Sequence, residues 1–140
     1  MAQTMRRRER GAVAVEMAII LPLLLLVVGG IVDFGRAAFT QNVVTNAARE
    51  GARMRALGYT TGEATTRMNQ AMVGSNVAFT PNYWLVQATG APQANAPCPA
   101  SPLVTDRQRV RVTVTNFSWI FPIPVSTPTL TSEAEMRCGG

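Results

Sequence analysis

The sequence predicts an α+β protein in which a long N-terminal helix crosses a membrane, continues beyond it and packs on a small antiparallel β-sheet. Three observations predict this class. Residues 12–32 are almost continuously apolar, residues 33–57 keep a helical spacing of small and apolar residues, and two segments after residue 105 alternate apolar with polar residues. Because 47% of the 140 residues are hydrophobic and only 15% are charged, a wholly disordered chain and a globular domain without a membrane element are both excluded.

Residues 12–32 are long and apolar enough to cross a membrane as a helix. The segment has 21 residues and one charge, Glu16, and a helix of that length spans about 31 Å. Residues 1–11 contain four Arg and carry a net charge of +3, whereas the remaining 129 residues carry +2. The positive-inside rule therefore predicts a single-pass protein of the cytoplasmic (inner) membrane, with a cytoplasmic N-terminus and an extracytoplasmic C-terminal part.

Two simpler interpretations of this segment stay open. A cleaved signal peptide needs a short apolar run followed by an A-x-A-like site, whereas this run is long and Gly29 and Gly30 lead into Ile31 and Val32. An uncut signal anchor fits the length but leaves the carboxylate of Glu16 unexplained. A carboxylate one turn inside an apolar helix costs about 2–3 kcal/mol unless it snorkels to the surface or is protonated.

A cut between Gly11 and Ala12 explains the position of Glu16. Ala12 would gain a free amine, and Glu16 follows four residues later on the same helix face. Amine and carboxylate could then neutralise each other, within one chain or between neighbouring chains. The sequence therefore predicts Gly11, Ala12 and Glu16 as a processing site, with residues 1–11 as a cleaved basic leader.

These residues resemble the processing site of type IV-like prepilins, in which a basic leader ends in Gly and Glu is the fifth residue after the cut. The chain resembles the TadE/TadF-type minor pilins (pseudopilins) of tight-adherence (Tad, type IVc-like) pilus systems. The segments that carry the resemblance are residues 10–17 (RGAVAVEM), 21–26 (LPLLLL), 33–36 (DFGR), 45–53 (TNAAREGAR), 110–114 (VRVTV) and 134–137 (AEMR). Met17 departs from the pattern, because many relatives have an aromatic residue there.

The resemblance implies a pilin-like fold and a structural role in a Tad-type pilus. The chain would be a minor pilin that acts in pilus biogenesis or adhesion; whether it enters the fibre, sits at its tip or stays in the membrane is left open by the sequence. The implied partners are the prepilin peptidase, the Tad platform proteins, the major and minor pilins and membrane lipid. Nucleic acid, a small-molecule substrate, a cofactor and a metal are not expected. An enzyme is not expected either, since the chain contains no His and its acids are scattered.

The helix is expected to continue outside the membrane over residues 33–57 and to stop before Gly58. Small residues at three- to four-residue spacing form a stripe on one face of this extension. The stripe either packs on the protein's own sheet or allows close approach of other subunits. Pro22 would let the helix bend as it leaves the membrane. The predicted assembly interface consists of Glu16, Pro22, Ala47, Ala48, Gly51 and Ala52.

Residues 58–140 are expected to form a small α+β head with antiparallel strands. Thr60 and Glu63 fit a capping box at the start of a short helix. Strands are expected at 76–80 and 83–88 on either side of Pro81, and after a Pro-rich loop over 89–102 at the two alternating segments, 109–114 and 130–138. Antiparallel pairing of the last two strands would place two Arg on the same face as two Glu: Arg109, Arg111, Glu133 and Glu135.

The same arginines support an alternative function from another class. An uncleaved, signal-anchored extracellular module could bind anionic or polysaccharide ligands through Arg107, Arg109 and Arg111. A second open question is the connection 117–125, which is apolar, aromatic and interrupted by Pro. It either caps a small core or exposes a docking surface for another subunit or for the outer leaflet of the membrane.

Cys98 and Cys138 are the only cysteines of the chain, and the predicted topology places both outside the cytoplasm. An even number of cysteines in an oxidising compartment favours a disulfide between them. Two free thiols or bridges to other chains are the alternatives. A metal site is not expected, since there is no His and no C-x-x-C motif.

Overall fold

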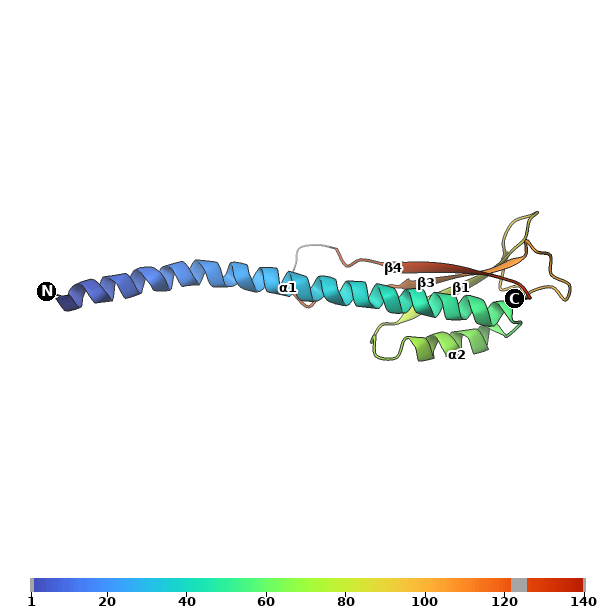
Figure 1. Ribbon diagram of the computed structural model, residues 1–140, viewed down its shortest axis with the longest axis horizontal. Coiled ribbons are helices and arrows are strands. Elements are labelled where there is room, and N and C mark those ends of the chain that lie inside the picture. Colours follow the sequence, from blue (N-terminus) through green and yellow to red (C-terminus); the bar gives the residue numbers. More distant parts are fainter. Residues whose placement is uncertain (1, 122–125, 140) are drawn as a thin grey trace. The chain divides into compact units, whose positions relative to one another are not determined.

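The computed structural model describes residues 2–121 and 126–139, and for residues 2–10 it describes the backbone alone. The elements follow in the order α1 (Ala2–Ala56), α2 (Thr61–Ala71), β1 (Phe79–Val86), β2 (Gln93–Ala94), β3 (Arg107–Val114) and β4 (Leu130–Arg137) (Figure 1). The predicted α+β class is confirmed. The chain divides into two compact units: the anchor unit, residues 1–36 with 119–125, and the head unit, residues 37–118 with 126–140.

Helix α1 begins further towards the N-terminus than the apolar pattern predicts. It starts at Ala2 rather than near residue 12 and continues through Pro22. Residues 2–10 contain neither Pro nor Gly and consist mainly of strong helix formers, so nothing in them ends the helix. Within the described residues, α1 is the one helix long and apolar enough to cross a membrane, which suggests a membrane anchor.

The C-terminal end of α1 is closed by a Schellman motif. Gly58 has a φ of +90°, a left-handed conformation that favours glycine. Its N–H donates to the carbonyl of Arg55, and the N–H of Tyr59 donates to the carbonyl of Met54, each at 3.1 Å. The predicted stop before Gly58 therefore has a clear hydrogen-bonding cause.

Helix α2 begins with the capping box that the sequence predicts. The N–H of Glu63 donates to the Thr60 hydroxyl at 3.3 Å, and the N–H of Thr60 donates to the Glu63 carboxylate at 2.9 Å. The hydroxyl of Thr60 donates to the same carboxylate oxygen at 2.8 Å. Two of the N–H groups at the helix start, which have no partner within the helix, are thereby satisfied.

The four strands of the head unit form one antiparallel sheet in the order β2-β1-β3-β4. Strand β3 pairs along its whole length with β1 on one side and with β4 on the other. Its register with β4 places Arg109 opposite Glu135 and Arg111 opposite Glu133. The alternation of apolar and charged residues thus predicts this pairing correctly.

Strand β1 is a single strand, so the prediction of two short strands separated by Pro81 is wrong. Pro81 lies opposite Val112 of β3, whereas β2 pairs only with Trp84 and Leu85. At Pro81, the side of β1 that faces away from β3 therefore has no neighbour among the described strands. Because Pro has no N–H group, it is tolerated at such an edge, where no hydrogen bond to a neighbouring strand is lost. The short strand β2 also lies within residues 89–102, which the sequence predicts as loop.

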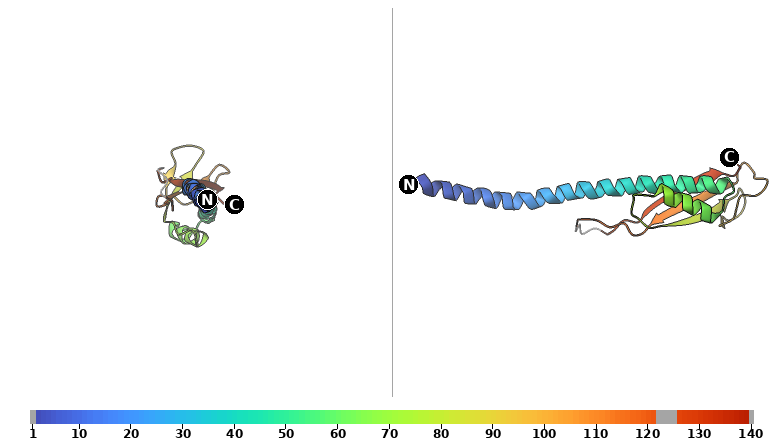
Figure 2. Two further views of the ribbon diagram at one scale, coloured as in Figure 1. Left: turned by 90° about the vertical axis from the view of Figure 1, so that its left-hand side faces the viewer. Right: turned by 90° about the horizontal axis from the view of Figure 1, so that it is seen from below.

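The core of the head unit lies between one face of the sheet and the helices. Figures 1 and 2 show α2 and the C-terminal part of α1 on the same side of the sheet. Val110, Val112 and Val114 of β3 are fully buried on this face. Tyr83 of β1 joins the layers, because its hydroxyl lies 3.3 Å from the Met68 sulfur and the Arg55 guanidinium lies 5.8 Å from its ring centroid. Burial raises the pKa of Tyr83.

Candidate processing, assembly and anchoring sites

Gly11, Ala12 and Glu16 lie on the exposed surface of α1 in the anchor unit. The bond between Gly11 and Ala12 lies within the continuous helix, and a Cβ added at Gly11 would meet nothing within 4 Å. Ala12 and Glu16 are about one turn and 6 Å apart along the axis, so they share a face. Among the side chains that the structure describes, none forms a hydrogen bond or ion pair with Glu16.

The stripe of small residues lies in the core of the head unit. Ala47, Ala48 and Ala52 have no exposed surface, and Gly51 is also buried. A Cβ added at Gly51 would lie 2.5 Å from the sulfur of Met68 in α2. The structure thus supports internal packing, since a buried face offers no surface to other subunits. Of the six residues predicted as an assembly interface, Glu16 and Pro22 are exposed.

Asp33 is a fully buried carboxylate in the anchor unit, directly after the predicted membrane span. The N–H groups of Ile120 and Phe121 donate to its two oxygens, each at 3.0 Å. Arg36, one turn further along α1, donates to Oδ1 at 3.2 Å. Three donors satisfy a charge that would be costly to bury alone. We call residues 119–121, which Asp33 fastens to α1, the aromatic clip.

Ring contacts hold the aromatic clip against α1 on both sides of Asp33. The rings of Trp119 and Phe34 lie 6.1 Å apart between centroids and are tilted by 47°. A Cβ added at Gly29 would lie 2.6 Å from the ring of Phe121, so this ring rests on the backbone of α1. A Cβ at Gly30 would meet nothing. The close approach of Phe121 thus explains why residue 29 is glycine.

The aromatic connection 117–125 has no single role in the structure. Phe117 is buried in the head unit, as expected of a residue that caps a small core. Residues 119–121 belong to the anchor unit instead. Residues 122–125 lie outside the described residues, so the structure does not test the prediction there.

Part of the chain, within α1, matches a known protein family. Residues 11–53 match the family of TadE-like proteins. The match confirms the predicted resemblance to TadE-like proteins over these residues and supports a component associated with the Tad pilus. No curated protein and no solved structure shows significant similarity to the chain. The matched segment contains the predicted processing residues, Asp33 and the buried stripe, whereas α2 and the sheet follow it.

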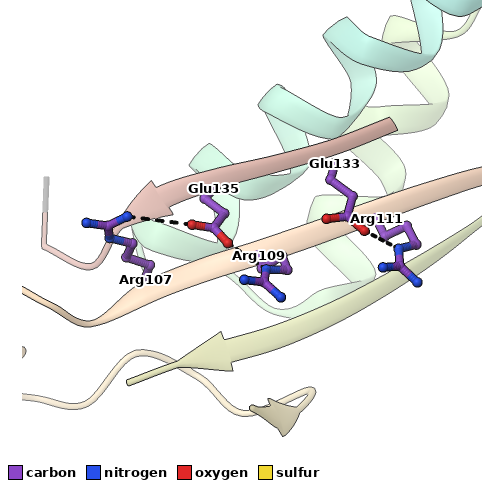
Figure 3. Close-up of polar contacts among 5 residues, drawn as sticks. All are labelled: Arg107, Arg109, Arg111, Glu133 and Glu135. Carbon is purple, nitrogen blue, oxygen red and sulfur yellow. Dashed lines mark hydrogen bonds and ion pairs between the residues drawn. The ribbon is translucent and has the colours of Figure 1, made fainter. Parts of the chain in front are cut away.

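The outer face of the sheet, beyond the TadE-like segment, carries a ladder of ion pairs (Figure 3). Glu135 lies 2.5 Å from Arg109 and 3.7 Å from Arg107, and Glu133 pairs with Arg111. The Arg111 guanidinium also lies 5.6 Å from the centroid of the Trp84 ring. Because the arginines are 35–49% exposed, each pair contributes about 0.2–1 kcal/mol. The arginines of the alternative binding function therefore already have carboxylate partners.

Arg55, two residues after the TadE-like segment, is a buried residue that the sequence does not single out. Its side chain is 4% exposed and donates to three carbonyls, those of Tyr59 at 2.8 Å, Asn95 at 3.1 Å and Ala96 at 2.8 Å. A cation in the last turn also interacts favourably with the helix dipole. Arg55 therefore ties the end of the helix to the loop that holds Cys98.

The disulfide favoured by the cysteine count is present between Cys98 and Cys138, with Cα atoms 5.7 Å apart. Next to it, the N–H of Cys138 donates to the carbonyl of Asp106 at 3.0 Å, and the N–H of Gly139 donates to that of Ala56 at 3.3 Å. The bridge thus joins the Pro-rich loop to the end of β4. In residues 2–121 and 126–139, no group of three His, Cys, Asp or Glu could hold a metal ion.

Proposed function

We propose that this chain is a minor pilin of a Tad-type pilus, made with a basic leader and cut between Gly11 and Ala12 by a prepilin peptidase. The observation that carries the proposal is the position of Glu16. Its carboxylate is exposed on the apolar part of α1, one turn after Ala12, within the segment that matches TadE-like proteins. That match starts at residue 11, next to the proposed cut, which supports the same boundary.

The proposed chemistry is charge neutralisation in the membrane. Before the cut, Glu16 is a lone carboxylate that costs about 2–3 kcal/mol in an apolar helix. After the cut, the amine of Ala12 is a positive partner, and the attraction between the two is strong where water is scarce. The pairing can close within one chain or join neighbouring helices, and in the second case it sets the register of subunits.

The proposed location and partners follow from this chemistry. The leader lies in the cytoplasm, residues 12–32 cross the inner membrane and the head unit lies outside. Gly11, Ala12 and Glu16 act as the substrate of the peptidase, so the role of the chain is structural rather than catalytic. Its remaining partners are the platform proteins of the Tad system and the major and minor pilins, which meet α1 during assembly.

The Glu16→Gln variant tests this proposal in cells that carry the complete pilus system. The matched control is Glu50→Gln, which removes a carboxylate that pairs loosely with Arg67, at 3.8 Å, in the head unit. Glu16→Gln leaves the new amine without its partner. If the loss is about 2–3 kcal/mol, incorporation into pili or the assembly complex falls roughly 30- to 150-fold.

Two readouts separate maturation from assembly. Immunoblots follow loss of the leader, and sheared surface fractions follow pili. We expect Glu16→Gln to reach the membrane and to fail in assembly, whereas Glu50→Gln assembles normally. Normal pilus levels with Glu16→Gln would contradict the proposed role of the carboxylate.

A further inference from the structure

The aromatic clip lies at the level of α1 where the predicted membrane span ends. Phe121 contacts Gly29, about 4.5 Å before the end of the span, and Trp119 contacts Phe34, about 3 Å beyond it. The headgroup layer on each side of a bilayer is about 5–7 Å thick. The contacts of the clip therefore cover the transition from hydrocarbon to headgroups.

Large apolar side chains are exposed around the clip. Phe34 is 70% exposed, Ile31 67% and Ile120 61%, and they continue the exposed apolar surface of residues 11–28. The N–H groups of Ile120 and Phe121 donate to Asp33, so these two donors do not need water. A loop with these two N–H groups satisfied and with aromatic and aliphatic side chains suits the membrane interface, where Trp is enriched.

We propose that the aromatic clip inserts into the outer leaflet of the membrane that α1 crosses, as an anchor of the head at the lipid surface. The inference rests on the membrane topology of the proposed function, but not on cleavage or on pilus assembly. Lipid is the occupant because the clip continues the lipid-facing surface of the span. Asp33 acts as the positioning residue, because its hydrogen bonds with the N–H groups of Ile120 and Phe121 hold the loop against α1.

Tryptophan quenching tests the proposal on the full, uncut chain in nanodiscs of phosphatidylcholine and phosphatidylglycerol. The chain has two Trp, so Trp84→Phe leaves Trp119 as the only reporter. The matched control is Trp119→Phe, which leaves Trp84 on the outer face of the sheet. Lipids with a nitroxide near the headgroup quench from the membrane, and acrylamide quenches from water. We expect lipid quenching of Trp119 and acrylamide quenching of Trp84.

A pair of glycine variants in the Trp84→Phe background tests the role of the clip geometry. Gly29→Ala places a methyl group where the Phe121 ring lies, whereas Gly30→Ala meets nothing. We expect Gly29→Ala to reduce lipid quenching of Trp119 several-fold and Gly30→Ala to leave it unchanged. Asp33→Ala, which removes the acceptor of both clip N–H groups, should act like Gly29→Ala.

Acrylamide quenching of Trp119 as strong as that of Trp84, without lipid quenching, would overturn the inference. Protection of Trp119 that arises only when other pilins are added would also overturn it, since the occupant would then be a protein. Neither result bears on cleavage after Gly11. Conversely, lipid quenching in a chain that its own cells never process would support the clip and contradict the proposed function.

Discussion

Asp33 and Arg55 are buried charged residues, Glu16 lies in the proposed membrane span, and each of the three depends on a different kind of partner. Asp33 accepts from two backbone N–H groups and from Arg36. Arg55 donates to three carbonyls and binds no carboxylate among the described residues. For Glu16 we propose an amine that exists only after a cut. Single residues of this protein thus fix loops, a helix end and, in the proposal, neighbouring subunits.

These three residues also differ in how far the sequence predicts them. Glu16 is conspicuous because it is the one charge between Ala12 and Val32. Asp33 and Arg55 look like ordinary charged residues of a helix, and besides a local partner each has a backbone partner far along the chain, 87 residues away for Asp33 and 41 for Arg55. Burial that depends on such distant backbone groups leaves no local pattern, so the sequence could not predict it.

Glu63 makes the stability of the head depend on pH. Two hydrogen bonds from Thr60 lower the pKa of Glu63 below its ordinary value of 4.5, and the bond from the backbone N–H has a larger effect than the bond from the hydroxyl. Because the pKa is lower in the folded chain than in the unfolded chain, this contribution is complete above about pH 4.5 and is lost as the pH falls through the folded value.

Urea unfolding of the detergent-solubilised protein checks this expectation. The free energy of unfolding of the native protein should exceed that of Glu63→Gln at neutral pH, and the difference should shrink below about pH 4.5. A difference that stays constant until the protein unfolds in acid would show that the charge of Glu63 contributes nothing.

At the scale of elements, strands β3 and β4 and the ends of the helices follow from local patterns. Strict alternation predicts the strands and their register, Gly58 predicts the end of α1, and Thr60 with Glu63 predicts the start of α2. Strand β1 is missed as a single strand because Pro81 reads as a break. The strand tolerates Pro81 because β2 is too short to pair with β1 at this position. This is a property of the whole sheet that the sequence of β1 alone does not reveal.

The contact between α1 and α2 depends on Gly51. A Leu at this position would overlap the side chain of Met68, which is fully buried, so we expect Gly51→Leu to lower the free energy of unfolding by about 1–3 kcal/mol. The control is Gly35→Ala, where an added Cβ meets nothing. Because Ala favours the helix more than Gly does, this variant should stabilise α1 by up to about 1 kcal/mol.

Thermal unfolding followed by circular dichroism, in the same detergent for both variants, measures these changes. If Gly51→Leu unfolded at the same midpoint temperature as the native protein, α2 would not pack on Gly51 in solution. Strong destabilisation by Gly35→Ala would show that helix α1 is crowded where the structure leaves open space.

At the scale of the whole molecule, the TadE-like segment of residues 11–53 extends into the head unit, which is held together by a disulfide and by hydrogen bonds of buried side chains. The Cys98–Cys138 bridge closes a loop of 40 residues, for which loss of chain entropy predicts a stabilisation of about 4 kcal/mol. This figure is an upper bound, because strain and residual structure in the unfolded chain reduce it.

We therefore expect the double variant Cys98→Ser, Cys138→Ser to unfold at a lower urea concentration than the oxidised protein, with a loss of about 2–4 kcal/mol. The native protein treated with a reducing agent should lose the same amount, whereas the agent should leave the double variant unchanged. Equal stability of the oxidised and reduced proteins would contradict a stabilising role of the bridge.

The central claim for the molecule is that the Glu16 carboxylate pairs with the Ala12 amine, which exists only after the leader is removed. An intact mass measured on the protein extracted from the membranes of its own cells tests this most directly. The claim predicts a species that begins at Ala12 and lacks the mass of residues 1–11. A fully functional species that retains Met1, or one cut near Gly30, would contradict it.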